Sequence, residues 1–249
     1  MFSTYLKTAI RFFFRNKTFT ILNVCGLALS LLTFLLLTFY VKDELSYDRF
    51  NKNADRIFRI NTDLKFGATI SSRAITSPAM AKSLQQNFPE IENFVRLLPD
   101  AEVFKKGNEF LSEDKGVYTD QSVFDVFSFE ILNGNAKTVF NNPYAIVLTK
   151  SMALKYFNST NIIGKTIEFM NDSNLHVVTA VISDIPRQSH FSFDFFLSMK
   201  SVQISESPKL NALFPFSINN FFILHFQYQF FFLSSFCPAD YFCVNAKLF

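Results

Sequence analysis

The feature that most constrains this chain is an uncharged apolar run from Phe19 to Val41. It contains 23 residues, of which 14 are Leu, Ile, Val or Phe. As an α-helix it would be about 34 Å long, which is enough to cross a bilayer core with some tilt. At roughly 0.3 to 0.6 kcal/mol for each of these apolar residues, insertion is favoured by about 4 to 8 kcal/mol, more than one Asn and a few hydroxyls cost. We therefore expect residues 19–41 to form a transmembrane helix.

A cleavable signal peptide is the main alternative for this run. Its apolar region should be shorter and should end in small residues at a cleavage site. Here the run ends in Phe39-Tyr40-Val41 and is followed by Lys42-Asp43-Glu44. The sequence therefore favours a retained anchor.

The charges before the run orient it. Residues 1–41 carry four basic side chains and no acidic ones, and acidic residues follow the run. Positive charge collects on the cytoplasmic side of a membrane. We expect the N-terminus to be cytoplasmic and the following domain to be periplasmic, in a cell inner membrane. The membrane-orienting residues are Lys7, Arg11, Arg15 and Lys17.

The remaining charge is nearly balanced. Residues 42–200 carry eighteen basic and nineteen acidic side chains, so the excess positive charge lies beside the apolar run and not on the folded domain. A nucleic-acid-binding domain needs a basic patch of its own. The charge pattern argues against a nucleic-acid partner.

Residues 1–18 form a cytoplasmic amphipathic segment by their spacing. Apolar residues such as Phe2 and Phe13 fall on one side of a helix, and the basic residues, spaced four apart, fall on another. Such a helix lies on a membrane surface, with its basic stripe against anionic lipid head groups. The alternative is that it is simply the cytoplasmic start of the spanning helix.

One face of the apolar run carries small and polar residues. Asn23, Gly26 and Ser30 fall at helical spacing, and Gly26 with Ser30 forms a small-xxx-small pair that lets another helix approach closely. These residues are our candidate helix-packing face. Scattered small residues are also ordinary in single anchors, which leaves that alternative open.

Residues 42–200 predict a mixed α/β extracytoplasmic domain, so the chain as a whole is of the α+β class. Short alternating runs indicate strands, and capped apolar stripes indicate helices. Expected strands are 57–62, 94–98, 145–148, 166–169 and 176–182, and expected helices are 78–88, 122–127 and a helix capped by Thr149. A hairpin is expected at Lys106-Gly107-Asn108 and a turn at Asp184-Ile185-Pro186.

Residues 201–249 differ from everything before them. The last 48 residues hold eleven of the 35 Phe and only four charged residues. Their pattern fits neither an amphipathic helix nor an alternating strand. Phe221–Phe236 is too short and polar for a convincing second span, and we interpret the tail as an out-of-frame translation.

Motifs for catalysis or cofactor binding are missing. Gly164-Lys165-Thr166 resembles part of a phosphate loop, but Ser159 stands where that motif needs Gly, so we expect a tight turn. His176, His190 and His225 lie far apart, so we expect no metal and no cofactor.

Acidic and sulfur-containing side chains add no reactive site. Asp43, Glu44 and Asp48 cluster after the span, and we interpret them as solvated charge because no nucleophile lies near them in sequence. The three cysteines, Cys25, Cys237 and Cys243, are too few and too badly placed for a disulfide framework. We expect that the protein is not an enzyme.

Several local motifs resemble, in the expected order, the start of MacB-like, FtsX-type permeases of ABC transporters, particularly their Bacteroidetes branch. The likeness covers about residues 1–200. It rests on Asp43-Glu44-Leu45-Ser46-Tyr47-Asp48-Arg49-Phe50, Ala54-Asp55-Arg56-Ile57-Phe58-Arg59-Ile60, Thr76-Ser77-Pro78-Ala79-Met80, Phe88-Pro89-Glu90-Ile91, Phe124-Asp125-Val126-Phe127-Ser128-Phe129, Ala145-Ile146-Val147-Leu148-Thr149-Lys150, Ile163-Gly164-Lys165-Thr166, Asp184-Ile185-Pro186, Ser189-His190-Phe191 and Phe193-Asp194-Phe195.

This resemblance implies a permease subunit that couples ATP hydrolysis by a separate ABC ATPase to movement of the external domain, for export or efflux. It also implies a homodimer or heterodimer of permeases and further spans after the core domain. Those spans are absent from the sequence, so we expect a truncated or frame-shifted copy. The alternatives are a single-span membrane-anchored sensor or ligand-binding protein and a membrane-anchored hydrolase.

Overall fold

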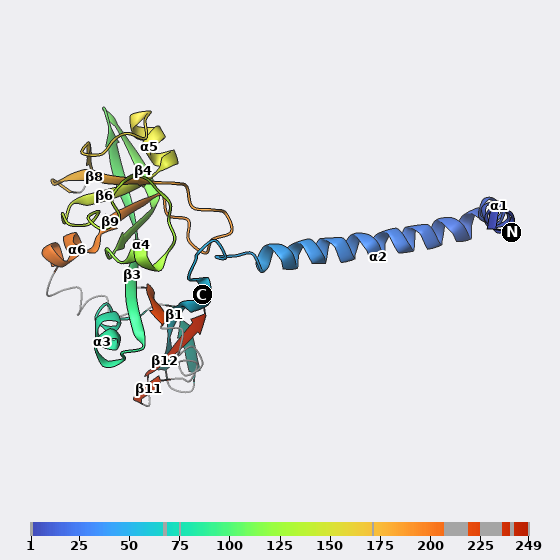
Figure 1. The fold of residues 1–249 in the computed structure, drawn as a ribbon, viewed down its shortest axis with the longest axis horizontal. Coiled ribbons are helices and arrows are strands. Elements are labelled where there is room, and N and C mark those ends of the chain that lie inside the picture. Colours follow the sequence, from blue (N-terminus) through green and yellow to red (C-terminus); the bar gives the residue numbers. More distant parts are fainter. Residues whose placement is uncertain are drawn as a thin grey trace. The chain divides into compact units, whose positions relative to one another are not determined.

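The computed structural model describes residues 2–66, 69–74, 76–170, 172–206, 219–224, 236–239 and 242–248 (Figure 1). It divides the chain into two compact units, Met1–Tyr47 and Asp48–Phe249, which we describe separately.

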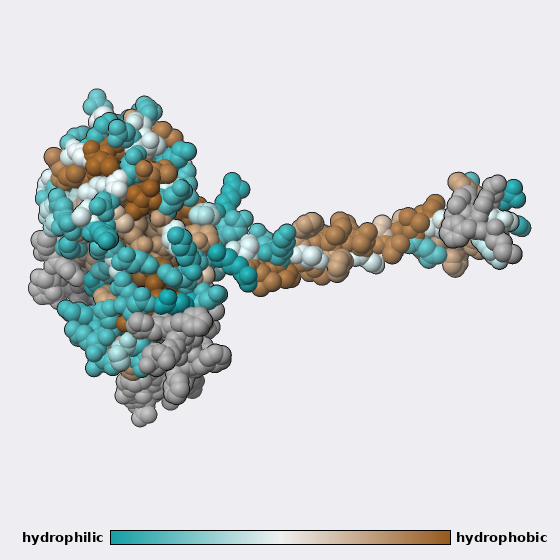
Figure 2. Space-filling model, viewed as in Figure 1, coloured by the Kyte–Doolittle hydropathy of each residue, from teal (hydrophilic) through white to brown (hydrophobic). Residues whose placement is uncertain are grey.

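The first unit consists of two helices, α1 (Phe2–Arg15) and α2 (Lys17–Glu44). Helix α2 contains the whole apolar run and has 28 residues, none of them buried. Figure 2 shows hydrophobic residues along most of its length. Within the part of the chain that the structure describes, α2 is the one helix long and apolar enough to cross a membrane. The predicted apolar helix is confirmed as a candidate span.

The second unit contains a single mixed sheet of twelve strands. Along the sheet the order is β11-β12-β1-β10-β3-β4-β9-β6-β8-β5, with β2 paired to β1 and β7 to β8. The strands are β1 (Ile57–Phe66), β2 (Thr69–Arg73), β3 (Ile91–Lys106), β4 (Glu109–Thr119), β5 (Ile131–Gly134), β6 (Ala145–Thr149), β7 (Thr166–Glu168), β8 (Leu175–Ile182), β9 (Phe195–Ser198), β10 (Asn219–Leu224), β11 (Phe236–Ala239) and β12 (Phe242–Leu248).

Only two of the strand pairs described here, β4 with β9 and β6 with β8, are parallel; the other pairs are antiparallel. Each parallel pair needs a crossover connection, and α5 (Lys150–Phe157) lies in the one from β6 to β8. The remaining helical elements of the unit are η1 (Ala54–Arg56), α3 (Met80–Asn87), α4 (Val123–Val126) and α6 (Met199–Glu206). The predicted α+β class is confirmed.

The sheet centre is buried on both faces. Along β6, Ala145 and Val147 face one apolar cluster while Ile146 and Leu148 face the other. Because successive side chains of a strand point to opposite faces, this is the pattern of a strand covered on both sides. A smaller cluster packs α3 against β1 and β3.

Local capping fixes α5 where the sequence predicts it. The Thr149 hydroxyl accepts the Met152 N–H at 3.4 Å, and the Asp184 carboxylate accepts both the N–H (2.9 Å) and the hydroxyl (2.7 Å) of Ser151. A carboxylate at a helix start satisfies free N–H groups and complements the helix dipole. The Asp184 segment is therefore a second cap of α5 as well as a turn.

Strand β10 (Asn219–Leu224) lies beyond the domain boundary predicted at residue 200. This strand pairs with both β1 and β3, and its Phe221 and Ile223 are buried in the main core. Residues 221–224 form part of a strand, so the possible second span does not begin at Phe221. Residues 225–235 of that run lie outside the described residues. The out-of-frame hypothesis for later residues stays a prediction, which the nucleotide sequence tests.

Candidate functional site at the entry to the core domain

The chain enters the core domain through Asp48, four residues after α2 ends. Asp48 has φ +54°, in the left-handed region that Asp and Asn tolerate better than most residues. Its side chain is 2% exposed. Its backbone N–H donates to the carbonyl of Gln188 at 2.8 Å, in the loop between β8 and β9. The first residue of the domain is thus turned sharply and held by a distant loop.

The carboxylate of Asp48 contacts His190 in the same loop. It accepts the His190 backbone N–H at 3.2 Å, and its second oxygen is hydrogen-bonded to Nδ1 of the imidazole. A buried carboxylate needs such partners because burial without them is costly. The expectation that Asp48 is solvated charge is therefore wrong, whereas Asp43 and Glu44 at the end of α2 are exposed.

A second contact binds the entry segment to the loop after α4. The Asn51 amide donates to the Asp48 carbonyl (3.2 Å) and its Oδ1 accepts the Ser128 N–H (3.0 Å). The Lys52 N–H donates in turn to the Ser128 hydroxyl at 2.9 Å. Asn51 is 4% exposed, so these bonds are shielded from water. We call Asp48, Asn51, Ser128 and His190 the entry clamp.

The entry clamp is continuous with an aromatic part of the core. Phe127 and Phe191, the neighbours of Ser128 and His190, have ring centroids 5.3 Å apart, and both contact Phe221 at 5.5 and 5.2 Å in edge-to-face geometry. Such pairs stabilise packing beyond the area they bury. The entry segment is thereby in contact, through these loops, with close-packed side chains of the core.

The contacts of the entry clamp attach the first residues of the domain to two of its loops. The clamp holds no nucleophile beside a general base. Groups of three or more His, Cys, Asp or Glu suited to a metal ion are absent from the part of the chain that the structure describes. His176 contacts Asp172 at 3.0 Å, and His225 lies outside the described residues.

One group of acidic side chains lies elsewhere, on the bulge between β3 and β4. Burial, and after it the charge of Asp100, raises the pKa of Glu102 to about 7. Burial also raises the pKa of Asp100. The Tyr118 hydroxyl donates to Glu102 at 3.2 Å. Because the pKa values of Glu102 and Asp100 are raised in the folded state, the free energy of unfolding is expected to depend on pH.

An open hollow of about 360 Å³ lies beside the β3–β4 hairpin tip and α5. Its lysines are already engaged: Lys105 with Glu168 (2.6 Å) and Lys106 with the Lys155 carbonyl (2.6 Å). Lys155 itself is paired with Glu113 (2.5 Å). Because their charges and donors have protein partners, these lysines do not form an obvious anion site.

The tight turn predicted at Gly164 is confirmed. Gly164 has φ +84°, which favours glycine, and its N–H donates to the Val178 carbonyl at 2.8 Å. The Lys165 ammonium lies 5.2 Å from the Phe157 ring centre.

The predicted helix-packing face lies on α2, and all three of its residues are exposed. Ser30 donates its hydroxyl to the Gly26 carbonyl at 2.9 Å, and a side chain added at Gly26 would meet no atom within 4 Å. Thr33 and Thr38 also bond to carbonyls four residues back. Within the described residues, the exposed Asn23 amide makes no side-chain hydrogen bond.

The predicted membrane-orienting residues lie on the first unit. Lys7, Arg11 and Arg15 are on α1, where Arg11 and Arg15 are exposed, and Lys17 begins α2. Arg15 and Lys17 come together at the bend between the helices, where both line one hollow.

Comparison with known proteins identifies the family. The sequence model of the MacB-like periplasmic core domain matches residues 20–224. The chain belongs to this family. The match begins within α2 and extends to the end of β10, beyond the boundary predicted at residue 200. Members of this family are domains of ABC-type transporter permeases, which are not a class of enzymes. The resemblance noted in the sequence is confirmed.

Solved structures with TM-scores above 0.5 share the fold of this MacB-like domain. A domain of a Porphyromonas gingivalis protein assigned as a permease is 14% identical, with a TM-score of 0.63 over 80% of this chain and 93% of that one. The periplasmic region of MacB from Actinobacillus actinomycetemcomitans is 18% identical, with a TM-score of 0.51 over 74% and 80%. The extracellular domain of the ABC-type transporter YknZ from Gram-positive bacteria is 13% identical, with a TM-score of 0.49 over 68% and 83%. A search of curated proteins finds no match.

The entry clamp links two segments that carried the sequence resemblance. Asp48 belongs to the motif after the span, and His190 to the Ser189-His190-Phe191 motif. Sequence reasoning listed both segments but did not pair them. The available signal was an Asp in one motif and a His in the other, because a carboxylate and an imidazole can form a hydrogen bond.

Proposed function

We propose that the chain is a permease subunit of an ABC transporter, which couples ATP hydrolysis by a separate cytoplasmic subunit to movement of the MacB-like core domain for export or efflux. Helix α2 spans the inner membrane, with the N-terminus cytoplasmic and the core domain periplasmic. The four basic residues before the apolar run 19–41 and the absence of acidic ones there support this orientation.

The observation that carries the proposal is the entry clamp in a domain of the permease family. A domain that only hangs from its anchor needs no buried carboxylate at its first residue. Here Asp48 and Asn51 attach the entry segment to two loops and, through them, to the aromatic core. Such an attachment converts displacement of α2 into displacement of the domain.

Helix packing in the membrane is the second requirement of a coupler. The Asn23, Gly26 and Ser30 face supplies close backbone approach at Gly26 and an unpaired amide at Asn23. We assign it to contact with spans of a second permease, in a homodimer or heterodimer.

Purification of the tagged chain from its native cells in mild detergent tests the proposal. We expect an ABC ATPase to be recovered at near-stoichiometric amounts, and recovery to persist in the Asp48→Ala variant, whose change lies outside the cytoplasm. A matched sample with α2 replaced by an unrelated span should lose the ATPase. Failure to recover any ATPase with the wild-type chain would contradict the proposal and favour the single-span sensor.

Orientation has its own measurement. In a variant without native cysteines, Ser46→Cys should react with a membrane-impermeant maleimide added to intact spheroplasts. Ser3→Cys in the same background should react only after the membrane is opened. The reverse pattern would contradict the proposed topology.

A further inference from the structure

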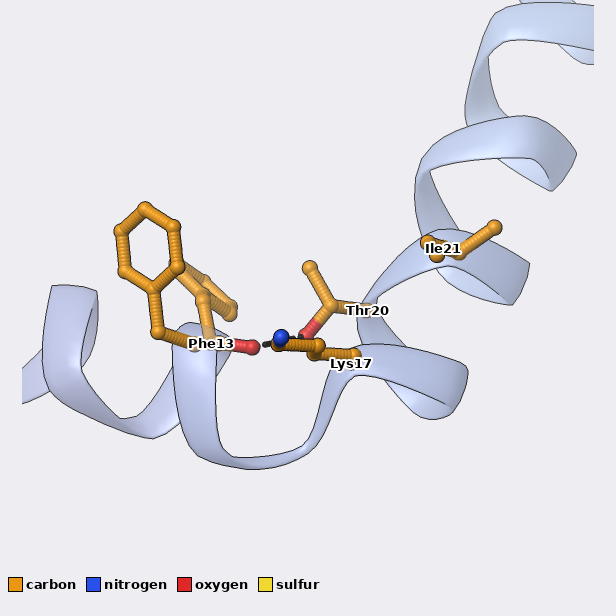
Figure 3. Close-up of a pocket in the computed structure, with 5 residues that line it drawn as sticks. Phe13, Lys17, Thr20 and Ile21 are labelled. Atoms are coloured by element: carbon orange, nitrogen blue, oxygen red, sulfur yellow. Dashed lines mark hydrogen bonds between the residues drawn. The ribbon is translucent and has the colours of Figure 1, made fainter.

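The bend between α1 and α2 is held by hydrogen bonds across the break. Helix geometry breaks at Asn16, with φ −109° and ψ 58°. The Thr20 hydroxyl lies across the break, within hydrogen-bonding distance of the carbonyls of both Phe13 (3.1 Å) and Asn16 (3.0 Å), as Figure 3 shows for Phe13. The Thr20 N–H also donates to the Asn16 carbonyl at 3.0 Å. We call residues 12–21 the elbow.

One side of the elbow is an apolar hollow of about 470 Å³. Its lining consists of Phe13, Phe14, Lys17, Thr20 and Ile21. Figure 3 shows Phe13 on the α1 side and Ile21 on the α2 side, with Lys17 and Thr20 between them. Among these five lining residues Lys17 is the one charged side chain, and the Thr20 hydroxyl is engaged with carbonyls of the elbow.

A second hollow of about 510 Å³ adjoins Lys17 and is more polar. It is lined by Phe12, Arg15, Asn16, Lys17, Thr18 and Phe19. Lys17 therefore lines both hollows, and Arg15 adds a second cation to the polar one. An amphiphile could place its apolar part in the first hollow and its anionic part in the second.

Charge complementarity decides which amphiphile fits. The first acidic residue of the chain is Asp43, so Arg15 and Lys17 have no carboxylate partner in their own segment. The uncharged run begins at Phe19, two residues after Lys17. With α2 across the membrane, the elbow lies where phosphates meet acyl chains, a location that rests on the proposed function.

We propose that the elbow is a binding site for an anionic phospholipid. Arg15 and Lys17 hold the phosphate, with the guanidinium offering paired donors, and an acyl chain packs against Phe13, Phe14 and Ile21. This goes beyond general attraction of a basic helix to a charged membrane, because it assigns one lipid to one bend.

The chain has no tryptophan, which permits a single-reporter test. Phe14→Trp places one fluorophore in the apolar hollow of the full chain, reconstituted in phosphatidylcholine vesicles. Brominated phosphatidylglycerol or brominated phosphatidylcholine is then added at equal mole fraction, and quenching is compared. We expect an apparent association about fivefold stronger for the anionic lipid, the order expected for a basic residue near anionic lipid.

Two charge variants separate the site from general electrostatics. Lys17→Gln should reduce the preference to near one, whereas Arg11→Gln, which removes the same charge outside both hollows, should leave most of it. Equal quenching by the two lipids at the elbow, or equal losses in the two variants, would overturn the proposal. So would a preference abolished by millimolar inorganic phosphate, which would show a phosphate site without lipid specificity.

A second reporter, Leu31→Trp near the middle of α2, distinguishes this failure from that of the proposed function. Quenching of Leu31→Trp by both lipids without preference, together with equal quenching at the elbow, would overturn the lipid site alone. No quenching of Leu31→Trp by either lipid would overturn both the site and the membrane span.

Discussion

The carboxylate of Asp48 contacts the imidazole of His190 across 142 positions of the sequence. Asp48 is buried, while the His190 side chain is 55% exposed. The pair therefore fastens the first residue of the core domain to a surface loop and leaves the imidazole accessible to water. The contact links the chain segment that follows α2 to the loop that precedes the central strand β9.

Replacement of Asp48 tests the clamp directly. Asp48→Ala removes both acceptors used by His190 and places alanine at φ +54°, so we expect a loss of about 2 kcal/mol in the free energy of unfolding. Asp48→Asn keeps an acceptor and a residue that tolerates this backbone, so its loss should be below about 1 kcal/mol. Urea unfolding of the detergent-solubilised chain, followed by circular dichroism, measures both. Equal losses would show that the clamp depends on charge and not on backbone shape and hydrogen bonding.

The entry clamp is also expected to transmit movement of the entry segment to the core domain. Asn51→Ala removes the bridge between the Asp48 carbonyl and the Ser128 N–H. We expect it to weaken ATP-dependent changes in the core domain, measured as altered protease cutting near residue 190, while ATPase recovery is unchanged. A wild-type response in Asn51→Ala would indicate that the entry segment moves the domain by another contact.

Local patterns predicted the elements that the sequence marks strongly. Thr149 is the cap of α5, Gly107 turns the β3–β4 hairpin at φ +62°, and the strand begun at Ile57 is β1. Each has a local cause, such as a capping hydroxyl or a left-handed turn. These causes act within a few residues, so the sequence displays them.

Contacts between distant segments could not be predicted in the same way. Strand β9 is buried on both faces and reads Phe195-Phe196-Leu197-Ser198, without alternation that would reveal it. Asp48 looked solvated because its partner lies in another loop. The entry clamp is a product of topology, which brings the β8–β9 loop to the start of the domain.

The pKa of Glu102 makes stability depend on pH. Burial and the neighbouring charge of Asp100 raise this pKa to about 7 in the folded state, above the ordinary value of 4.5. Between these values the folded state retains a proton that the unfolded state loses, so the contribution of Glu102 to stability falls as pH rises from about 4.5 to about 7. Glu102→Gln keeps an acceptor for Tyr118 and should be more stable than wild type at pH 8, with no advantage near pH 4.5.

Denaturant unfolding of both proteins at several pH values checks this expectation. Asp100→Asn is the informative companion, because removal of that charge should lower the pKa of Glu102 and shift the transition to lower pH. A constant stability difference between wild type and Glu102→Gln across this range would contradict the assignment.

Gly116 is required by the ring of Phe195 on the neighbouring strand. A Cβ atom at Gly116 would lie 2.3 Å from Cζ of Phe195 and 2.9 Å from the carbonyl oxygen of Asp100. We expect Gly116→Ala to cost roughly 1 to 3 kcal/mol by overpacking. Phe195→Leu should recover part of this loss in the double variant, which a double-mutant cycle of unfolding free energies measures. Additive losses would show that the backbone, and not the ring, excludes the side chain.

The proposed packing face of α2 gives the last prediction. Gly26→Leu fills space that is open in the isolated helix, so it should not disturb the helix itself. It should prevent close approach of a second helix, and we expect at least a severalfold loss of association between differently tagged copies in membranes, measured by energy transfer. Ala28→Leu adds similar bulk two residues away, about 200° around the helix, and should have little effect. Equal losses in the two variants, or none in Gly26→Leu, would contradict a packing role for the face formed by Asn23, Gly26 and Ser30.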